Sequence, residues 1–181
     1  KILNLGYPGG PNIEKFSKLG DKNSYVLPQP IINRGGCNLS LSGLKTDVLR
    51  KSKNIKSDQD RFNLAASFQE TIDKILRKKT EFAMNEFKKE FPDSPTKSFV
   101  VAGGVAANQT IRKSLKEISK KMNFKPFFPS KEFCGDNAAM IAWAGIKRYK
   151  KKLLNHKNET VRSRWPLDKN APFLKGPGLK I

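Results

Sequence analysis

Two glycine pairs, each followed directly by what reads as the start of a helix, are the residues of this 181-residue chain best suited to contact a ligand. Gly103 and Gly104 interrupt "VVAGGVAAN", and Gly9 and Gly10 stand in "YPGGPNIE". Without a Cβ, such a turn lets the backbone lie flat against a planar or anionic ligand, and the helix start favours negative charge. Each pair is equally compatible with a tight connection that binds nothing.

Two polar side chains accompany these pairs. Asn108 stands at the start of the helix after Gly104, where its amide can bond to a sugar or base or can cap its own helix. Glu14 follows Gly10 by about one helical turn, so its carboxylate faces back toward whatever contacts that glycine. Carboxylates bind ribose hydroxyls in other nucleotide sites. The alternative is that Glu14 is a solvated first-turn acid that interacts favourably with the helix dipole.

A third motif, "EFCGDNAAMIAWAG", places Asp136 just before an amphipathic segment. Its carboxylate either caps that helix or serves as a metal ligand or catalytic group. We expect Cys134 to be a small buried residue and not a nucleophile, because no His or Arg stands near it in the sequence. The single histidine, His156, cannot build a His-rich metal site, and it cannot supply the HExxH pattern of a metallopeptidase.

The elements that must position these residues alternate between helix and strand, as in an α/β layer. A short helix is expected from Pro11 to before Gly20. Apolar residues at helical spacing extend from about Ser57 to Phe91, and a charged break at Lys78 and Lys79 leaves either one helix or two.

Three strands are expected beside these helices. Residues 38–44 alternate polar and apolar side chains with period two, which predicts a half-buried strand. Residues 98–102 form a short apolar run typical of a strand covered on both faces, and residues 124–129 give another strand-like segment. Helices follow at residues 108–122 and 136–151, and residues 156–181 show no periodicity.

The composition points to a polyanionic partner. There are 36 Lys and Arg residues against 16 Asp and Glu residues, a net charge of +20, which favours nucleic acid unless the lysines only cover solvated faces. The basic segment 147–152 is expected to attract phosphates. The two cysteines show no CxxC spacing and fit a reducing compartment, and no apolar run approaches the ~18 residues of a membrane span.

The motifs "LGYPGGPNIEK", "NLSLSGLKTDV", "AASFQE", "VVAGGVAANQTIR", "FCGDNAAMIAWAG" and "RWPLD" occur in an order that resembles the tRNA adenosine threonylcarbamoyltransferase (TsaD) family, formerly called O-sialoglycoprotein endopeptidase. The resemblance implies an α/β fold in which residues 1–155 are part of the second RNase H-like lobe of an actin, Hsp70 and sugar-kinase-like architecture. Residues 156–181 would be an irregular basic tail.

The resemblance also implies the chemistry. Threonylcarbamoyl would pass from an adenylate to an anticodon-loop adenosine of tRNA, with an ATP or adenylate-type nucleotide and one iron or zinc ion as cofactors. The carried-over nucleotide contacts are Gly10, Glu14, Gly103, Gly104 and Asn108. Asp136 would be one metal ligand, although Gly135 stands where the family usually has threonine, and no residue is assigned as catalytic.

Family members are about twice as long, and their His-xxx-His metal pair and Ser-Gly-Gly-His phosphate loop are not in this sequence. We therefore expect the chain, which begins with Lys1, to be the C-terminal half of a longer cytoplasmic enzyme and to be inactive alone. Its implied partners are tRNA, TsaB- and TsaE-like proteins and the other half, without a membrane. Two alternatives are a metalloendopeptidase, after the older family name, and a non-catalytic nucleotide- or RNA-binding module.

Overall fold

The computed structural model describes residues 1–153, which divide into a compact unit at Lys1–Asn137 and a second unit that begins at Ala138. The first unit contains helices α1 (Gly9–Ser17), α2 (Ser42–Ser52), α3 (Asp58–Glu90) and α4 (Gln109–Lys121) and strands β1 (Ser98–Val100) and β2 (Lys125–Phe127). Two short 3₁₀ turns, η1 (Gly104–Ala107) and η2 (Lys131–Phe133), complete it. The described part of the second unit contains helix α5 (Ala138–Lys150).

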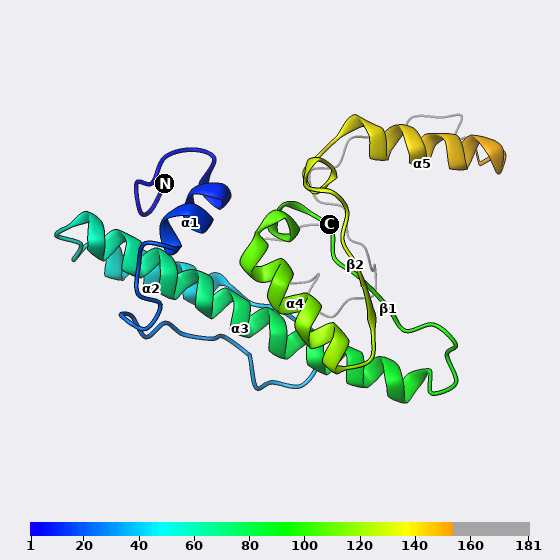
Figure 1. The fold of residues 1–181 in the computed structure, drawn as a ribbon, viewed down its shortest axis with the longest axis horizontal. Coiled ribbons are helices and arrows are strands. Elements are labelled where there is room, and N and C mark those ends of the chain that lie inside the picture. The colour runs from blue at the N-terminus through cyan, green and yellow to red at the C-terminus, as the bar shows by residue number, and fades with distance from the viewer. Residues whose placement is uncertain (154–181) are drawn as a thin grey trace, which may run out of the picture. The chain divides into compact units, whose positions relative to one another are not determined.

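Helix α3 is the long central element of the first unit, and α1, α2 and α4 all contact it (Figure 1). A capping box starts it: Ser57 accepts from the Asp60 amide, and the Asp60 carboxylate accepts from the Ser57 amide. The charged break predicted at Lys78 and Lys79 does not end the helix. Lys79 is buried there, and its ammonium donates to the carbonyl oxygens of Arg34 and Gly36 at 2.6 and 3.1 Å.

Two hydrophobic clusters flank α3. The first joins Leu3 and Leu27 to apolar residues of α2 and α3, and the second is built on Ile111, Leu115 and Ile118 of α4. Ile72 of α3 packs against both clusters. The start of α4 is thereby held against the middle of α3, and the apolar residues whose spacing predicted this helix form its buried side.

The two strands pair in parallel, with Phe99 opposite Pro126. This small parallel sheet with helices confirms the predicted α/β class. The prediction that residues 98–102 are covered on both faces is wrong, because Ser98 and Val100 are exposed and only Phe99 between them is half-buried. Val100 is 68% exposed.

The strand predicted at residues 38–44 is also wrong. Helix α2 begins inside that run at Ser42, and residues 38–41 form neither helix nor strand. Leu44 and Val48, four residues apart, are both buried in the first cluster. The segment is helical from Ser42 because Leu44 and Val48 then lie on the same side of the helix, facing the first cluster.

Helix α1 begins two residues earlier than predicted, at Gly9, and ends at Ser17. Gly20 beyond its end has a packing role: a Cβ there would lie 2.1 Å from the Phe62 carbonyl oxygen. Only glycine lets the chain pass this close to α3. Ring stacking of Phe16 on Phe62, with centroids 5.1 Å apart, secures the same contact.

Helix α5 confirms the helix predicted after Asp136. Its described apolar side chains, among them Ile141 and Trp143, are exposed. Residues 154–181, and with them the predicted tail and His156, lie outside the described residues. The predicted boundary between residues 155 and 156 stays a prediction.

Candidate nucleotide-binding corner

Glu14 of α1 contacts the start of α4, 95 residues further along the sequence. Its Oε1 accepts from the backbone N–H of Gln109, the first residue of α4, at 2.8 Å. Glu14 is the sixth residue of α1, so the interpretation of it as a first-turn acid of its own helix is wrong. Its carboxylate lies at the positive end of α4 instead. One residue of the first glycine motif thereby contacts the helix that follows the second.

A series of buried and half-buried hydrogen bonds connects Glu14 to Asn108 through side chains of α1 and α3. The Gln69 Nε2 on α3 donates to Ser17 Oγ at 2.8 Å, and Ser17 Oγ donates to the Glu14 carbonyl oxygen at 3.0 Å. In the other direction, Asn108 Nδ2 donates to Gln69 Oε1 at 2.7 Å. One side chain of α3 thus connects the ends of α1 and α4.

Backbone groups at both ends fix the donor-to-acceptor direction of this series of hydrogen bonds. A carbonyl oxygen of Glu14 can only accept, and the Ile111 N–H, which donates to Asn108 Oδ1 at 3.1 Å, can only donate. Each amide between them therefore has one orientation that satisfies its neighbours. The side-chain amides of Gln69 and Asn108 are fixed by hydrogen bonding as well as by packing.

Asn108 is the N-cap of α4, as one of the two predicted alternatives requires. Capping does not use up its amide, because a primary amide has two N–H donors and two lone pairs. One donor goes to Gln69 and one lone pair to Ile111. No other described residue takes the second donor and the second lone pair of this half-buried side chain, and their directions are fixed by the first two bonds.

The glycines of both pairs adjoin open space. A Cβ added to Gly10, Gly103 or Gly104 would meet no atom within 4 Å. Gly103 also has φ of +93°, a conformation that other residues adopt at a cost, so its identity follows from the turn itself. Gly10 and Gly104 have no such requirement. Among the described residues, no atom packs where their side chains would stand.

Asp136 is exposed, two residues before α5 begins. Its segment is tied to α4 by Arg112, whose guanidinium donates to the carbonyl oxygens of Ala106 and Pro129 at 2.9 and 3.0 Å and to Cys134 Sγ at 3.2 Å. Cys134 is buried, as predicted. The expectation that no arginine approaches it is wrong, because α4 brings Arg112 onto its sulfur from 22 residues away.

Among the described residues, no group of three or more His, Cys, Asp or Glu side chains could hold a metal ion. A zinc site needs at least three protein ligands. Asp136 is an exposed carboxylate and could supply one of them. The described residues therefore fit a contribution to a metal site and not a complete one.

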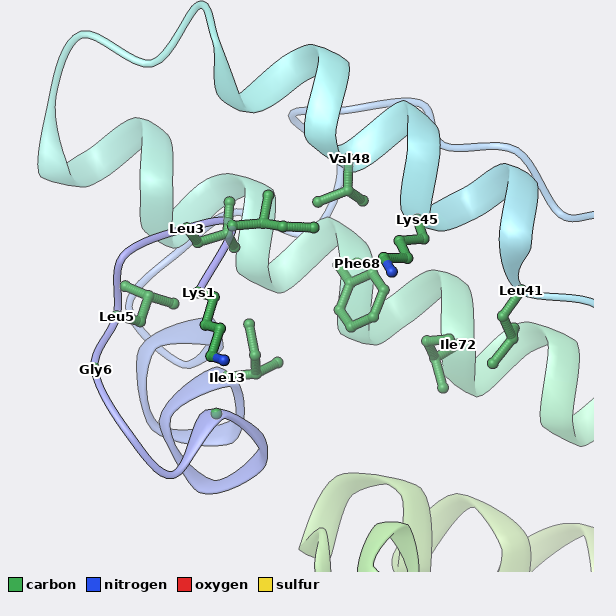
Figure 2. Close-up of a pocket in the computed structure, with 12 residues that line it drawn as sticks. Lys1, Leu3, Leu5, Gly6, Ile13, Leu41, Lys45, Val48, Phe68 and Ile72 are labelled. Atoms are coloured by element: carbon green, nitrogen blue, oxygen red, sulfur yellow. The ribbon is translucent and has the colours of Figure 1, made fainter. Parts of the chain in front are cut away.

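An apolar hollow of about 460 Å³ lies between α1, α2 and α3, and Gly9 of the first glycine pair lines it. Leu5, Ile13, Val48 and Phe68 point into it, and the ammonium of Lys45 lies beside it (Figure 2). It lacks the several converging polar groups that fix a nucleotide. None of the predicted nucleotide contacts lines it.

Sequence reasoning missed Gln69 and Ser17 as parts of the corner. The signal was present in Gln69, a polar side chain at a position where helical spacing places an apolar one. It is 8% exposed, and both of its polar atoms are satisfied. Because buried polar groups are nearly always hydrogen-bonded, a glutamine on the apolar face of a helix indicates a hydrogen-bond network.

Fold and corner together define an α/β protein with an open, glycine-edged corner at a helix N-terminus. The family model of TsaD, tRNA N6-adenosine threonylcarbamoyltransferase, matches residues 1–143, and the chain belongs to this family. The resemblance seen in the motifs is thereby confirmed.

Three curated relatives, each named tRNA N6-adenosine threonylcarbamoyltransferase, illustrate the similarity. The protein of Pelagibacter ubique is 51% identical over the whole chain and half of its own length. That of Rickettsia rickettsii is 45% identical over 93% of the chain and 49% of its own length. That of Brucella suis is 41% identical over 98% of the chain and 50% of its own length. The chain spans about half the length of the curated relatives it matches.

Proposed function

We propose that this chain is the C-terminal portion of an enzyme that transfers threonylcarbamoyl from its adenylate to an anticodon-loop adenosine of tRNA. Within that enzyme the corner formed by Gly10, Glu14, Gly103, Gly104 and Asn108 binds the nucleotide. The observation that carries the proposal is the 2.8 Å hydrogen bond from the Gln109 amide to Glu14, which links a residue of the first glycine motif to the helix that follows the second.

The corner favours the nucleoside part of the ligand over its phosphates. A free helix N-terminus attracts phosphate, but here the Glu14 carboxylate already occupies the first amide of α4. A second anion at that point would be repelled. Glu14 Oε2 accepts no hydrogen bond from the described residues, so it is available to a ribose hydroxyl, and the remaining donor and lone pair of Asn108 suit a sugar or base.

Asp136 is proposed as one carboxylate ligand of an iron or zinc ion, with the other ligands supplied from outside this chain. When bound, such an ion would act as a Lewis acid toward the threonylcarbamoyl adenylate. The role of this chain is to present the carboxylate on the segment that Arg112 anchors to α4. We propose tRNA and TsaB- and TsaE-like proteins as partners and the cytoplasm as the location, and that this chain alone does not catalyse transfer.

The glycines provide the test. Gly10→Ala and Gly104→Ala place a methyl group in open space, so both variants should fold as the parent does and should block the nucleotide. Gly35→Ala is the matched control, because a Cβ there also meets no atom within 4 Å and the neighbouring carbonyls of Arg34 and Gly36 bind Lys79. Calorimetry of ATP binding and mass-spectrometric detection of modified tRNA should show losses for the first two in the full protein. Equal ATP affinity in all three would refute the assignment of the corner.

No observation on the described residues favours the metallopeptidase alternative. In that same part of the chain, none of the helices could span a membrane. A nucleotide- or RNA-binding module without catalysis shares the corner with the proposed enzyme. A binding module of this kind would bind ATP with full affinity and would not modify tRNA, even in a protein as long as its relatives.

A further inference from the structure

Three exposed lysines on one side of α4 have no acidic partner among the described residues, whereas several cations of α2 and α3 are paired. On α3, Lys74, Lys78 and Lys89 each lie within 3.5 Å of a glutamate three or four residues away. On α2, Arg50 and Lys51 both pair with Asp47. On α4, Lys113, Lys116 and Lys120 form no ion pair with any described residue. We call these three residues the α4 lysine face.

The α4 lysine face forms one stripe. Its members are separated by three and four residues, so they follow one side of the helix over about 10 Å. All three are exposed, and the opposite side of α4 carries the buried Ile111, Leu115 and Ile118. Lys113, Lys116 and Lys120 also line a shallow hollow of about 320 Å³ together with Arg112 and Glu117. The charge is therefore concentrated on a surface with some concavity.

Lys116 shows that the stripe is partly ordered. Its ammonium lies 5.4 Å from the centre of the Phe128 ring, and the Arg112 guanidinium lies 5.0 Å from the same ring. Such contacts hold a cation without neutralising it. Glu117 is the one acid on this surface, and it forms no ion pair with a described residue. Four cations and one anion leave a local surplus of positive charge.

We propose that the α4 lysine face binds the sugar-phosphate backbone of RNA. Lysine ammoniums are point charges that contact phosphates without reading bases, so the face supplies attraction and register and no sequence preference. The stripe starts one turn after Asn108 and runs away from the corner along the same rigid helix. A polyanion bound there would be held beside the corner. That the RNA is tRNA rests on the proposed function.

The experiment compares two triple variants with the same change in net charge, both in the full protein. One is Lys113→Gln, Lys116→Gln and Lys120→Gln. The control is Lys74→Gln, Lys78→Gln and Lys89→Gln on α3, whose lysines have side chains 52%, 55% and 76% exposed but are paired. Binding of a tRNA transcript is measured across a salt series. Thermal unfolding verifies that both variants keep the parent's melting temperature.

We expect the α4 variant to lower the slope of log Kd against log salt concentration by about 2, since each phosphate contact contributes roughly 0.7 to 0.9. The α3 control should leave the slope nearly unchanged. If both variants reduce the slope equally, only net charge matters. If neither variant reduces the slope, RNA does not bind the α4 lysine face. Both results overturn the proposal. So does a result in which the α4 variant loses binding to phosphatidylserine vesicles and keeps its tRNA binding.

Glu117 supplies an independent test of opposite sign. Glu117→Gln removes the negative charge from this surface and should tighten tRNA binding, whereas Glu86→Gln on α3 removes a paired charge and should have little effect. Weaker binding by Glu117→Gln would contradict the proposal. Calorimetry with ATP separates the two proposals: loss of tRNA binding with normal ATP affinity concerns this face, and absence of ATP binding in the parent protein refutes only the corner.

Discussion

The side chains of Asn108 and Gln69 are hydrogen-bonded across two helices, with Asn108 Nδ2 donating to Gln69 Oε1 at 2.7 Å. Asn108 thereby does more than cap α4. Its amide plane is fixed relative to α3, and the groups left for a ligand point in set directions. Each residue of this network can be changed in a way that removes one hydrogen bond and leaves the next in place.

Gln69→Glu tests the direction of the network. A carboxylate still accepts from Asn108 but cannot donate to Ser17 or Thr110, and it places a charge in a buried position. We expect a loss of about 1 to 3 kcal/mol in the free energy of unfolding and a weaker affinity for ATP. Gln59→Glu is the control, since Gln59 also donates from α3 but is exposed to water. Equal effects in urea denaturation at both positions would mean that the network has no special role.

Asn108→Ser separates cap from ligand contact. Serine caps helices about as well as asparagine, so α4 should keep its start. The variant loses the donor to Gln69 and the spare N–H, and ATP affinity should fall by roughly 1 to 3 kcal/mol, the penalty for an unsatisfied buried partner. Calorimetry measures it, with circular dichroism as the check on helix content. Parent-like affinity would reduce Asn108 to a cap.

Glu14→Gln tests the acid at the α4 terminus. The amide oxygen can still accept from Gln109, but the charge that interacts with the helix dipole is lost, at about 0.3 to 1 kcal/mol of stability. Hydrogen bonds to a charged acceptor exceed those to a neutral one by about 1 kcal/mol, so nucleoside affinity should fall roughly fivefold. The same change removes the negative charge that repels anions, so inorganic phosphate should bind more tightly near the α4 terminus. Titration with adenosine and with phosphate, with Glu90→Gln as the exposed-acid control, measures both.

Asp73 provides a pH-dependent prediction. Burial raises the pKa of its carboxyl above the ordinary 3.8, against the lowering effects of the Ser114 hydroxyl and Arg77; Glu70 and Glu117 raise it further. The Ser114 hydroxyl donates to Oδ2 at 2.8 Å, while Oδ1 is buried without a partner among the described residues.

Because the folded state holds this proton more tightly than the unfolded state, the contribution of Asp73 to stability is greatest at low pH. It is lost as the pH rises from about 4 through the raised folded-state pKa. Asp73→Asn keeps an acceptor for Ser114 and removes the titration. Urea denaturation between pH 4 and pH 8 should show that the free energy of unfolding of the variant depends less on pH than that of the parent. An identical pH dependence would show that Asp73 is not the group that titrates.

Asp136→Asn tests the proposed metal-ligand role. Asp136 is exposed and lies two residues before α5, one position before the N-cap, so the melting temperature of the metal-free protein should not change. An amide oxygen is a much weaker ligand for iron or zinc, so the full protein should lose most of its bound metal and most of its transfer activity. Metal analysis by mass spectrometry measures the bound metal, with Asp58→Asn as the exposed control. Full metal occupancy in Asp136→Asn would show that Asp136 is not a metal ligand.

Local patterns alone predicted the elements whose signals are strong and repeated. The apolar spacing along α3 and α4 and the short apolar run at β1 identified an α/β unit, because side chains that must share one buried face recur at the period of their backbone. The motifs identified the family. Gly103 and the capping position of Asn108 could be predicted for the same local reason, since turn geometry and cap chemistry depend on adjacent residues.

Only the tertiary structure decided what each polar side chain contacts. Residues 38–44 show strand periodicity, yet Leu44 and Val48 find their buried partners as part of a helix. Lys79 looked like a solvated break, and loop carbonyls 43 and 45 residues away made it a buried donor. Glu14, Gln69 and Arg112 each bond to a partner at least 22 residues distant. Sequence spacing determines which residues share a face, whereas hydrogen bonding between distant segments depends on how the faces pack together.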